Sequence, residues 1–188
     1  MVRIPIKSNP KLFDKAFSYI QEALGVNIPW LDHIFGKAER LVKDINGKRY
    51  YTPNVFVGGN EYEDIEPDTR YLGNYSFFTL DEPQELSHEV GENTHLKAPF
   101  SLIVWCDLRK VGMDAERNTE AVKQELLQCL HGSVWMRHGH FKLTKVWEKA
   151  ENIFKGFTLD EIESQFLMQP YCGWRFEGII EISTECAL

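Results

Sequence analysis

The chain has 188 residues, 43% of them hydrophobic and 26% charged, and its formal net charge is −7. This length and composition fit one globular domain, residues 1–188, whose core is large enough to fold without disulfides or metal. The acidic balance argues against specific nucleic-acid binding, because phosphate binding needs clustered Lys and Arg. Local basic spots such as Lys48-Arg49 are too small to carry such a function.

The first half of the chain predicts a helix followed by strands. Ser8-Asn9-Pro10 is typical of a helix start, apolar residues recur at helical spacing from Leu12 to Leu24, and Gly25 is expected to end the helix. Residues 29–36 are predicted to form a short helical turn. Asn46-Gly47 lies between two strand-like runs and predicts a tight hairpin. The glycines at 58 and 59 indicate a turn, and residues 71–80 a strand rich in Tyr and Phe.

The second half predicts a strand, a helix and three further elements. The polar stretch 83–99 is expected to be a long loop or an extended hairpin arm. Residues 100–109 form a strand whose two faces are both apolar, so we expect it to be covered on both sides. A helix follows over 116–130, then a strand over 141–147. Thr158 to Glu161 matches a capping box for a short helix ending near Phe166.

The closing stretch, PYCGWRFEGIIEIS from Pro170 to Ser183, alternates between apolar and charged residues. The even-numbered face is expected to cover the helices, and it holds Cys172, Trp174, Phe176, Ile180 and Ile182. The odd-numbered face is expected to meet water or a neighbouring subunit, and it holds Tyr171, Arg175, Glu177, Glu181 and Ser183.

These elements predict an α+β fold. We expect an antiparallel or mixed sheet with the two main helices packed on one face. An extended loop or hairpin excursion over residues 58–99 is expected to leave this core.

The sequence also gives an expectation for redox state and location. The first 13 residues lack the apolar segment of a secretory signal, and the apolar run at 100–106 is too short to span a bilayer. We therefore expect a cytosolic protein, or part of a particle assembled in the cytosol, with no membrane partner. Cys106, Cys129, Cys172 and Cys186 contain no CxxC pair. Cys106 and Cys172 fall on apolar strand faces and are expected to be buried reduced thiols.

His138 and His140 are the most tempting candidate metal ligands. Two residues apart on a strand, they share a face and can bind zinc or iron if a third ligand comes from elsewhere; Cys129 and His131 are near in sequence. Because Gly139 separates the two histidines and no HExxH motif accompanies them, we favour a solvated turn.

Two further groups of polar residues carry a weaker signal. Asp107, Arg109 and Lys110 end a central strand in a pattern near that of metal-dependent nucleases, but Arg stands where the Lys belongs, so we favour a charged strand exit. The polar excursion contains histidines and glutamates that fit a metal site or a solvated loop, and we favour the loop; these are Glu85, His88, Glu89, Glu92 and His95.

The familiar catalytic signatures, GxSxG, the P-loop and GxGxxG, are missing from the sequence. We therefore expect no catalytic, cofactor-binding or metal-binding residues and no enzymatic activity.

The second half of the chain holds four stretches in this order: PFSLIVWCDLRK, ERNTEAVKQELLQCL, FKLTKVWEKAENIFKGF and FLMQPYCGWRFEGIIEIS. In the order of its elements, it resembles the tail terminator and related head–tail joining proteins of long-tailed bacteriophages. The resemblance also lies in the pattern of the closing strand, with Pro170, Tyr171, Arg175 and Glu177. It covers roughly residue 97 to the end, with the N-terminal helix in the expected place.

The resemblance implies a structural protein with no catalytic residues. Members form rings, commonly hexamers, that cap the tail tube and meet the head connector, so it implies a virion component assembled in the bacterial cytoplasm. The alternative is a small-molecule-binding or metal-dependent hydrolytic α+β domain with a pocket between sheet and helices.

Overall fold

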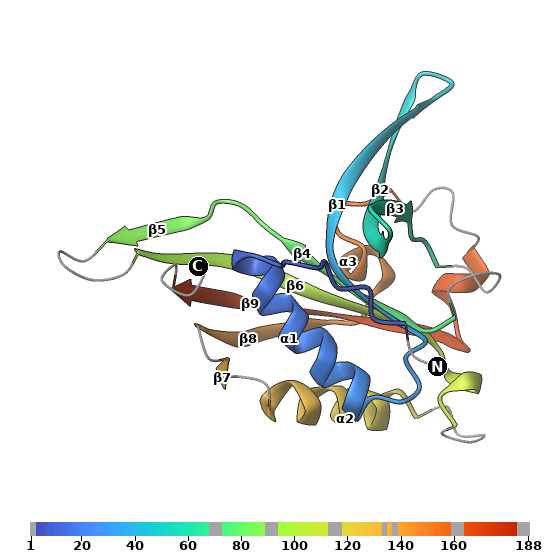
Figure 1. Cartoon of the computed structure of the whole chain (residues 1–188). Coiled ribbons are helices and arrows are strands. Elements are labelled where there is room, and N and C mark those ends of the chain that lie inside the picture. Colours follow the sequence, from blue (N-terminus) through green and yellow to red (C-terminus); the bar gives the residue numbers. More distant parts are fainter. Residues whose placement is uncertain are drawn as a thin grey trace.

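A mostly antiparallel open sheet is the centre of the fold (Figure 1). The computed structural model describes residues 3–67, 73–88, 94–112, 118–132, 135–136, 139–158 and 164–183. Eight strands of this part of the chain follow the order β3-β2-β1-β4-β6-β9-β8-β7, and β5 pairs with β6. The strands are β1 (His33–Ile45), β2 (Lys48–Gly58), β3 (Glu61–Asp64), β4 (Tyr75–Leu80), β5 (Glu85–His88), β6 (Thr94–Asp107), β7 (Trp135–Met136), β8 (Gly139–Trp147) and β9 (Tyr171–Ser183).

The helices are α1 (Leu12–Asn27), α2 (Thr119–Gly132), the short α3 (Ala150–Ile153) and two 3-10 turns, η1 (Leu108–Lys110) and η2 (Ser164–Leu167). The chain therefore has the predicted α+β class. None of the helices in the described ranges is long and apolar enough to cross a membrane.

Helix α1 does not end at Gly25 as the sequence predicts, but continues to Asn27. A Cβ at position 25 would meet Cδ1 of Ile4, the flexible end of a side chain that can shift. Gly25 therefore lies inside the helix, beside the N-terminal segment, and does not end it.

The prediction of a helical turn over residues 29–36 is wrong, because its second half begins strand β1. His33 and Ile34 pair in parallel with Tyr75 and Ser76 of β4. Ile34 and Phe35 are both buried and belong to the two different buried clusters, as residues on opposite faces of a strand do. Pairing with a strand some 40 residues later overrides the local pattern.

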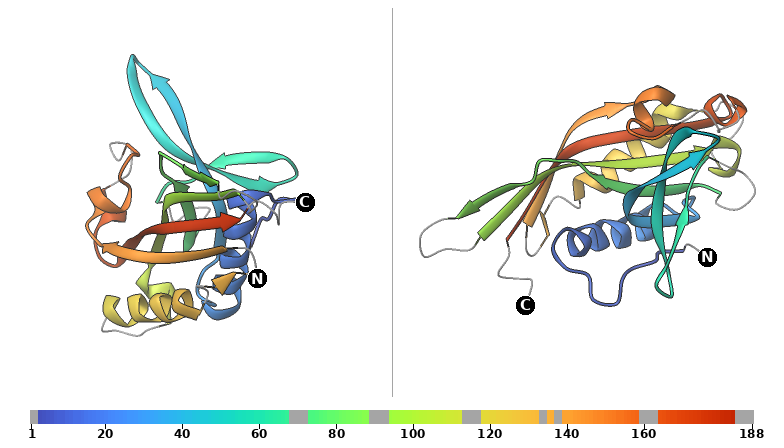
Figure 2. Two further views of the ribbon diagram at one scale, coloured as in Figure 1. Left: turned by 90° about the vertical axis from the view of Figure 1, so that its left-hand side faces the viewer. Right: turned by 90° about the horizontal axis from the view of Figure 1, so that it is seen from above.

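The predicted hairpin at Asn46-Gly47 is confirmed. Ile45 faces Lys48 across a two-residue turn, and Asn46 and Gly47 have φ angles of 53° and 76°. The β1–β2 hairpin projects well beyond the rest of the sheet (Figures 1 and 2).

The excursion from residue 58 to residue 99 is built mainly of strands in its described part. Gly58 and Gly59 have positive φ angles and form the predicted turn between β2 and β3. Glu85–His88 pairs antiparallel with the start of β6 as the outer strand of a second arm, which points away from the first hairpin (Figure 1). Residues 68–72 and 89–93 of the excursion lie outside the described residues.

Two buried clusters lie on the two faces of the central strands. One holds residues of α1 and α2 with the even-numbered residues of β6 and β9, among them Val104, Trp174 and Phe176. The other holds Ile103 and Trp105 of β6 with residues from β1, β2, β4, α3 and η2. The prediction that residues 100–109 are covered on both sides is therefore confirmed for β6.

The capping box at residues 158–161 lies mostly outside the described residues. The hydroxyl of Thr158 accepts a hydrogen bond from the backbone N–H of Tyr51 at 3.0 Å, and the N–H of Thr158 donates to the carbonyl of Tyr51 at 2.8 Å. Thr158 therefore links the segment after α3 to strand β2.

Candidate functional site

The odd-numbered face of β9 is only partly open, which corrects the prediction that the whole face is free for water or a neighbour. Near its start, Tyr171 packs beside the cluster that α3 and η2 cover, and Arg175 is buried with 3% of its surface exposed. Farther along, Ile179 is 38% exposed and Glu181 is half-buried. The face available to a partner therefore begins after Arg175.

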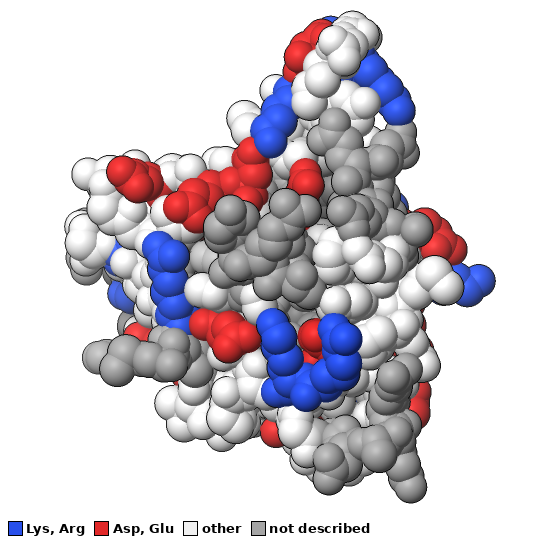
Figure 3. Space-filling view, turned by 90° about the vertical axis from the view of Figure 1, so that its right-hand side faces the viewer, with Lys and Arg blue, Asp and Glu red and all other residues white. Residues whose placement is uncertain are grey.

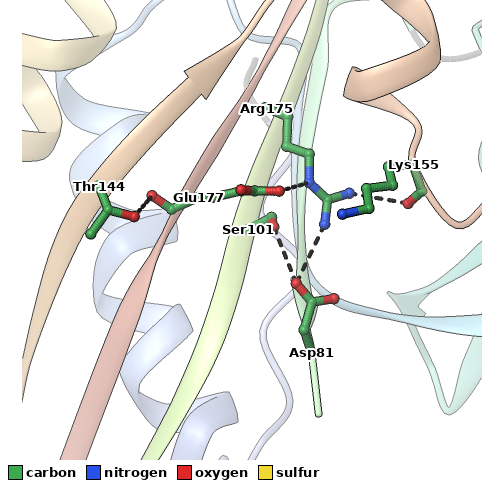
Figure 4. Close-up of polar contacts among 6 residues, drawn as sticks. All are labelled: Asp81, Ser101, Thr144, Lys155, Arg175 and Glu177. Atoms are coloured by element: carbon green, nitrogen blue, oxygen red, sulfur yellow. Dashed lines mark hydrogen bonds and ion pairs between the residues drawn. The ribbon is translucent and has the colours of Figure 1, made fainter. Parts of the chain in front are cut away.

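Arg175 is held by a polar network that the sequence did not reveal (Figure 4). Its guanidinium donates to Glu177 Oε1 at 3.2 Å, to the carbonyl oxygen of Lys155 at 3.1 Å and to Asp81 Oδ2 at 3.4 Å. Asp81 directly follows strand β4 and Lys155 follows α3, so one side chain joins three segments. Protein groups accept all of these hydrogen bonds, so the buried guanidinium is paired within the fold itself.

His140 lies on β8 opposite Glu181 of β9, whereas His138 lies outside the described residues. The Nε2 atom of His140 is 4.0 Å from one carboxylate oxygen of Glu181, and Nδ1 of His95 on β6 is 3.8 Å from the other. Glu181 thus lies between two imidazoles from flanking strands. Within the described ranges, no group of three or more His, Cys, Asp or Glu residues is arranged to hold a metal ion.

In the part of the chain that the structure describes, Cys129 and His131 do not form a metal-binding group with His140. The Cys129 thiol donates to the carbonyl of Ala23 at 3.6 Å, in the contact between α2 and α1. Burial raises the pKa of this thiol, which disfavours the metal-binding thiolate. His131 is exposed at the end of α2.

Asp107 at the end of β6 is used locally as the cap of the 3-10 turn η1. Its carboxylate accepts from the backbone N–H of Arg109 at 3.0 Å and from the Arg109 guanidinium at 2.9 and 2.8 Å. Burial by itself would raise the pKa of Asp107, but the hydrogen bonds and charge of Arg109 outweigh it and hold the pKa below its usual value. This geometry fits a charged strand exit, as favoured from the sequence.

The polar candidates of the excursion lie on the β5–β6 arm. Glu85 and Lys97 face each other across the two strands, with 3.6 Å between carboxylate and ammonium. His88 pairs with Thr94 through the strand ladder. Glu89 and Glu92 lie outside the described residues.

The β1–β2 hairpin exposes an unusual combination of aliphatic and basic side chains. Leu41, Val42 and Ile45 are 39%, 52% and 38% exposed. Residues 40–49 hold four basic residues and one acidic residue, whereas the whole chain carries −7, so the remainder of the chain carries −10. Basic side chains follow the projecting hairpin, and acidic ones gather beside its base (Figure 3).

A groove of about 890 Å³ lies between α2 and β8. Its floor is apolar, with Leu127 and Leu130 from the helix and Phe141 and Leu143 from the strand. His131 and His140 both line it. The alternative hypothesis from the sequence places a pocket between sheet and helices, and this groove lies between such elements, but the sequence did not identify α2 and β8 as its walls.

The burial of Arg175 had one usable sign in the sequence. Ile103 and Trp105 indicate that the odd-numbered face of β6 is covered, and Arg175 lies directly opposite Ile103 in the next strand. The odd-numbered face of β9 must therefore also be covered at that level. Recognising this requires the register between the two strands, which is set by tertiary pairing.

No model of a known protein family matches the chain, and no curated protein matches it significantly in sequence.

Proposed function

We propose that the chain is a non-enzymatic structural protein of a bacteriophage or prophage tail, a tail terminator or head–tail joining component that assembles into a ring of about six copies. The element order and the closing strand support the proposal through their resemblance to that class. The observation that carries it is the projecting β1–β2 hairpin with its exposed Leu41, Val42 and Ile45. Apolar side chains on an arm far from the core contribute little to folding and suit contact with a partner.

The charge distribution favours a second copy as the partner of the hairpin. The hairpin tip is basic and the rest of the chain is strongly acidic. A basic arm on one subunit is therefore attracted to the surface of the next, and opposite charges set the orientation of such contacts. Because the arm and the surface it meets are different parts of the chain, the interface is heterologous, which generates a ring when the rotation closes.

The packing of the body is consistent with this arrangement. We take α1 and α2 to pack together on one face of the sheet, since their residues share one buried cluster. Three surfaces then remain for contacts with neighbouring subunits, the tail tube and the head connector. They are the β1–β2 hairpin, the β5–β6 arm and the odd-numbered face of β9 after Arg175. Such a component belongs to the virion and assembles in the host cytoplasm.

A charge-reversal experiment tests the role of the hairpin. Lys48→Glu with Arg49→Glu places two negative charges on the tip, and Lys142→Glu with Lys145→Glu makes the same change on exposed residues of β8. We expect the hairpin variant to lose self-association and the β8 variant to keep it, measured as mass by light scattering at equal ionic strength. Equal loss in both variants would contradict a specific role for the hairpin.

The groove between α2 and β8 supports a second candidate, a small-molecule-binding or metal-dependent hydrolytic domain. Its volume falls within the range of about 300–1,000 Å³ that is usual for ligand sites, and its lining combines apolar residues with charged and amide side chains and two histidines. Metal analysis of untagged protein and a thermal-shift screen with small ligands test this candidate. Stoichiometric zinc or iron would favour it over the assembly protein.

A further inference from the structure

Two thiols face each other across the central strands of the sheet. Cys106 on β6 and Cys172 on β9 are direct partners in the antiparallel ladder. Their sulfur atoms are 3.3 Å apart. Residues directly opposite in such a pair have Cα atoms about 4.5–5.5 Å apart, within the range of about 4.4–6.8 Å that disulfides require. The sulfurs need to approach by only roughly 1.2 Å to reach bonding distance.

The two thiols differ in their access to solvent. Cys106 is fully buried, whereas Cys172 is half-buried and lines a cavity of about 210 Å³ between Trp105, Trp174 and the η2 segment. The hydrogen bond shared with Cys172, together with burial, raises the pKa of the Cys106 thiol well above its usual value. A small oxidant entering the cavity therefore meets Cys172 first.

We propose that Cys106 and Cys172 form an oxidisable pair that closes to a disulfide between β6 and β9 when the protein meets a peroxide. The Cys172 thiolate attacks one peroxide oxygen, the O–O bond breaks, and Cys172 becomes a sulfenic acid; the other oxygen leaves as hydroxide and becomes water by taking up the proton that the thiol released. Cys106 sulfur then attacks Cys172 sulfur, the S–O bond breaks, and a second water leaves with the thiol proton. Two thiols and one hydrogen peroxide thus give one disulfide and two waters.

The bond would join the two strands that form the longest ladder of the sheet. A link between residues far apart in the sequence restricts the unfolded chain and stabilises the fold. The reducing cytosol keeps such a pair open, and an oxidising exterior allows it to close. The oxidation of the two thiols goes beyond the proposed function. Only its timing rests on that function, because closure of the disulfide after release of a particle assumes that the protein belongs to one.

Peptide mapping of the full-length protein tests the pair directly. Fully reduced protein is treated with hydrogen peroxide, the remaining thiols are alkylated under denaturing conditions, and the digest is analysed by mass spectrometry. We expect a peptide pair joining Cys106 to Cys172, a mass about 2 Da lower, and a higher melting temperature that dithiothreitol reverses. Cys129 serves as the internal control, because its thiol is also half-buried but donates to a backbone carbonyl. It should stay reduced during peroxide treatment and should therefore be alkylated.

Single-cysteine variants test the order of the two steps. In Cys106→Ala, a dimedone probe should trap sulfenic acid at Cys172 after peroxide treatment, whereas in Cys172→Ala, Cys106 should remain unmodified. Alkylation of both thiols in peroxide-treated wild-type protein, or disulfides that join other cysteines instead, would overturn the proposal even if a variant fails to fold. Trapping at Cys106 but not Cys172 would overturn the assigned order.

Discussion

The buried guanidinium of Arg175 links β9 to the residue after β4 and to the segment after α3. Removing one member of a buried ionic network leaves the charges of its partners unpaired. Asp81 and Glu177 keep some contact with water, with 46% and 21% of their side chains exposed. This contact limits the loss of stability when Arg175 is removed.

Substituting Arg175 with Met should lower the free energy of unfolding by about 2–3 kcal/mol. Urea denaturation measures this change. Lys145→Met is the matched control, because Lys145 is an exposed cation on the neighbouring strand, and its effect should stay within about 0.5 kcal/mol. Equal effects would contradict the structural role of Arg175.

Asp107 should make the stability of the protein sensitive to acid. The fold lowers the pKa of Asp107. The stability that its carboxylate contributes is therefore present above the ordinary pKa of about 4 and is lost as the pH falls through the lowered value. Melting temperatures of wild-type and Asp107→Asn proteins should therefore differ at pH 7 and converge in strong acid. Arg109→Gln should reproduce the same convergence. A gap that does not change with pH would show that the Asp107–Arg109 pair is not its source.

Strand β9 contributes its even-numbered face to the buried cluster that also contains residues of α1 and α2. Trp174 is 2% exposed, while Trp147 on β8 is 37% exposed, so the two tryptophans form a matched pair. Trp174→Ala should cost about 3–5 kcal/mol in the free energy of unfolding, and Trp147→Ala about 1 kcal/mol or less. Similar losses would contradict the assignment of Trp174 to the core.

Elements that depend on local sequence could be predicted, and those that depend on distant pairing could not. The Asn46-Gly47 hairpin and the alternation of β9 follow from turn chemistry and from period-two patterning. His33, Ile34 and Lys37 pair in parallel with β4, and α1 continues past Gly25. Neither outcome follows from the neighbouring residues in the sequence.

At the scale of the whole molecule, the sequence predicted the α+β class and the existence of an excursion. It did not predict how far the two arms project or which elements line the groove, because both depend on the positions of elements in space. The burial of Arg175 depends in the same way on α3 and η2 covering the start of β9. The exposure of the surfaces that carry the proposed function could therefore be seen only in three dimensions.

Self-association is the central claim about the whole molecule, and the absolute mass of the wild-type protein tests it most directly. Light scattering across a concentration series, with negative-stain imaging of the largest species, should give a closed ring of about six copies of the 21.9 kDa chain. A mass that stays at that of one chain at every concentration, with no rings in the images, would contradict the claim.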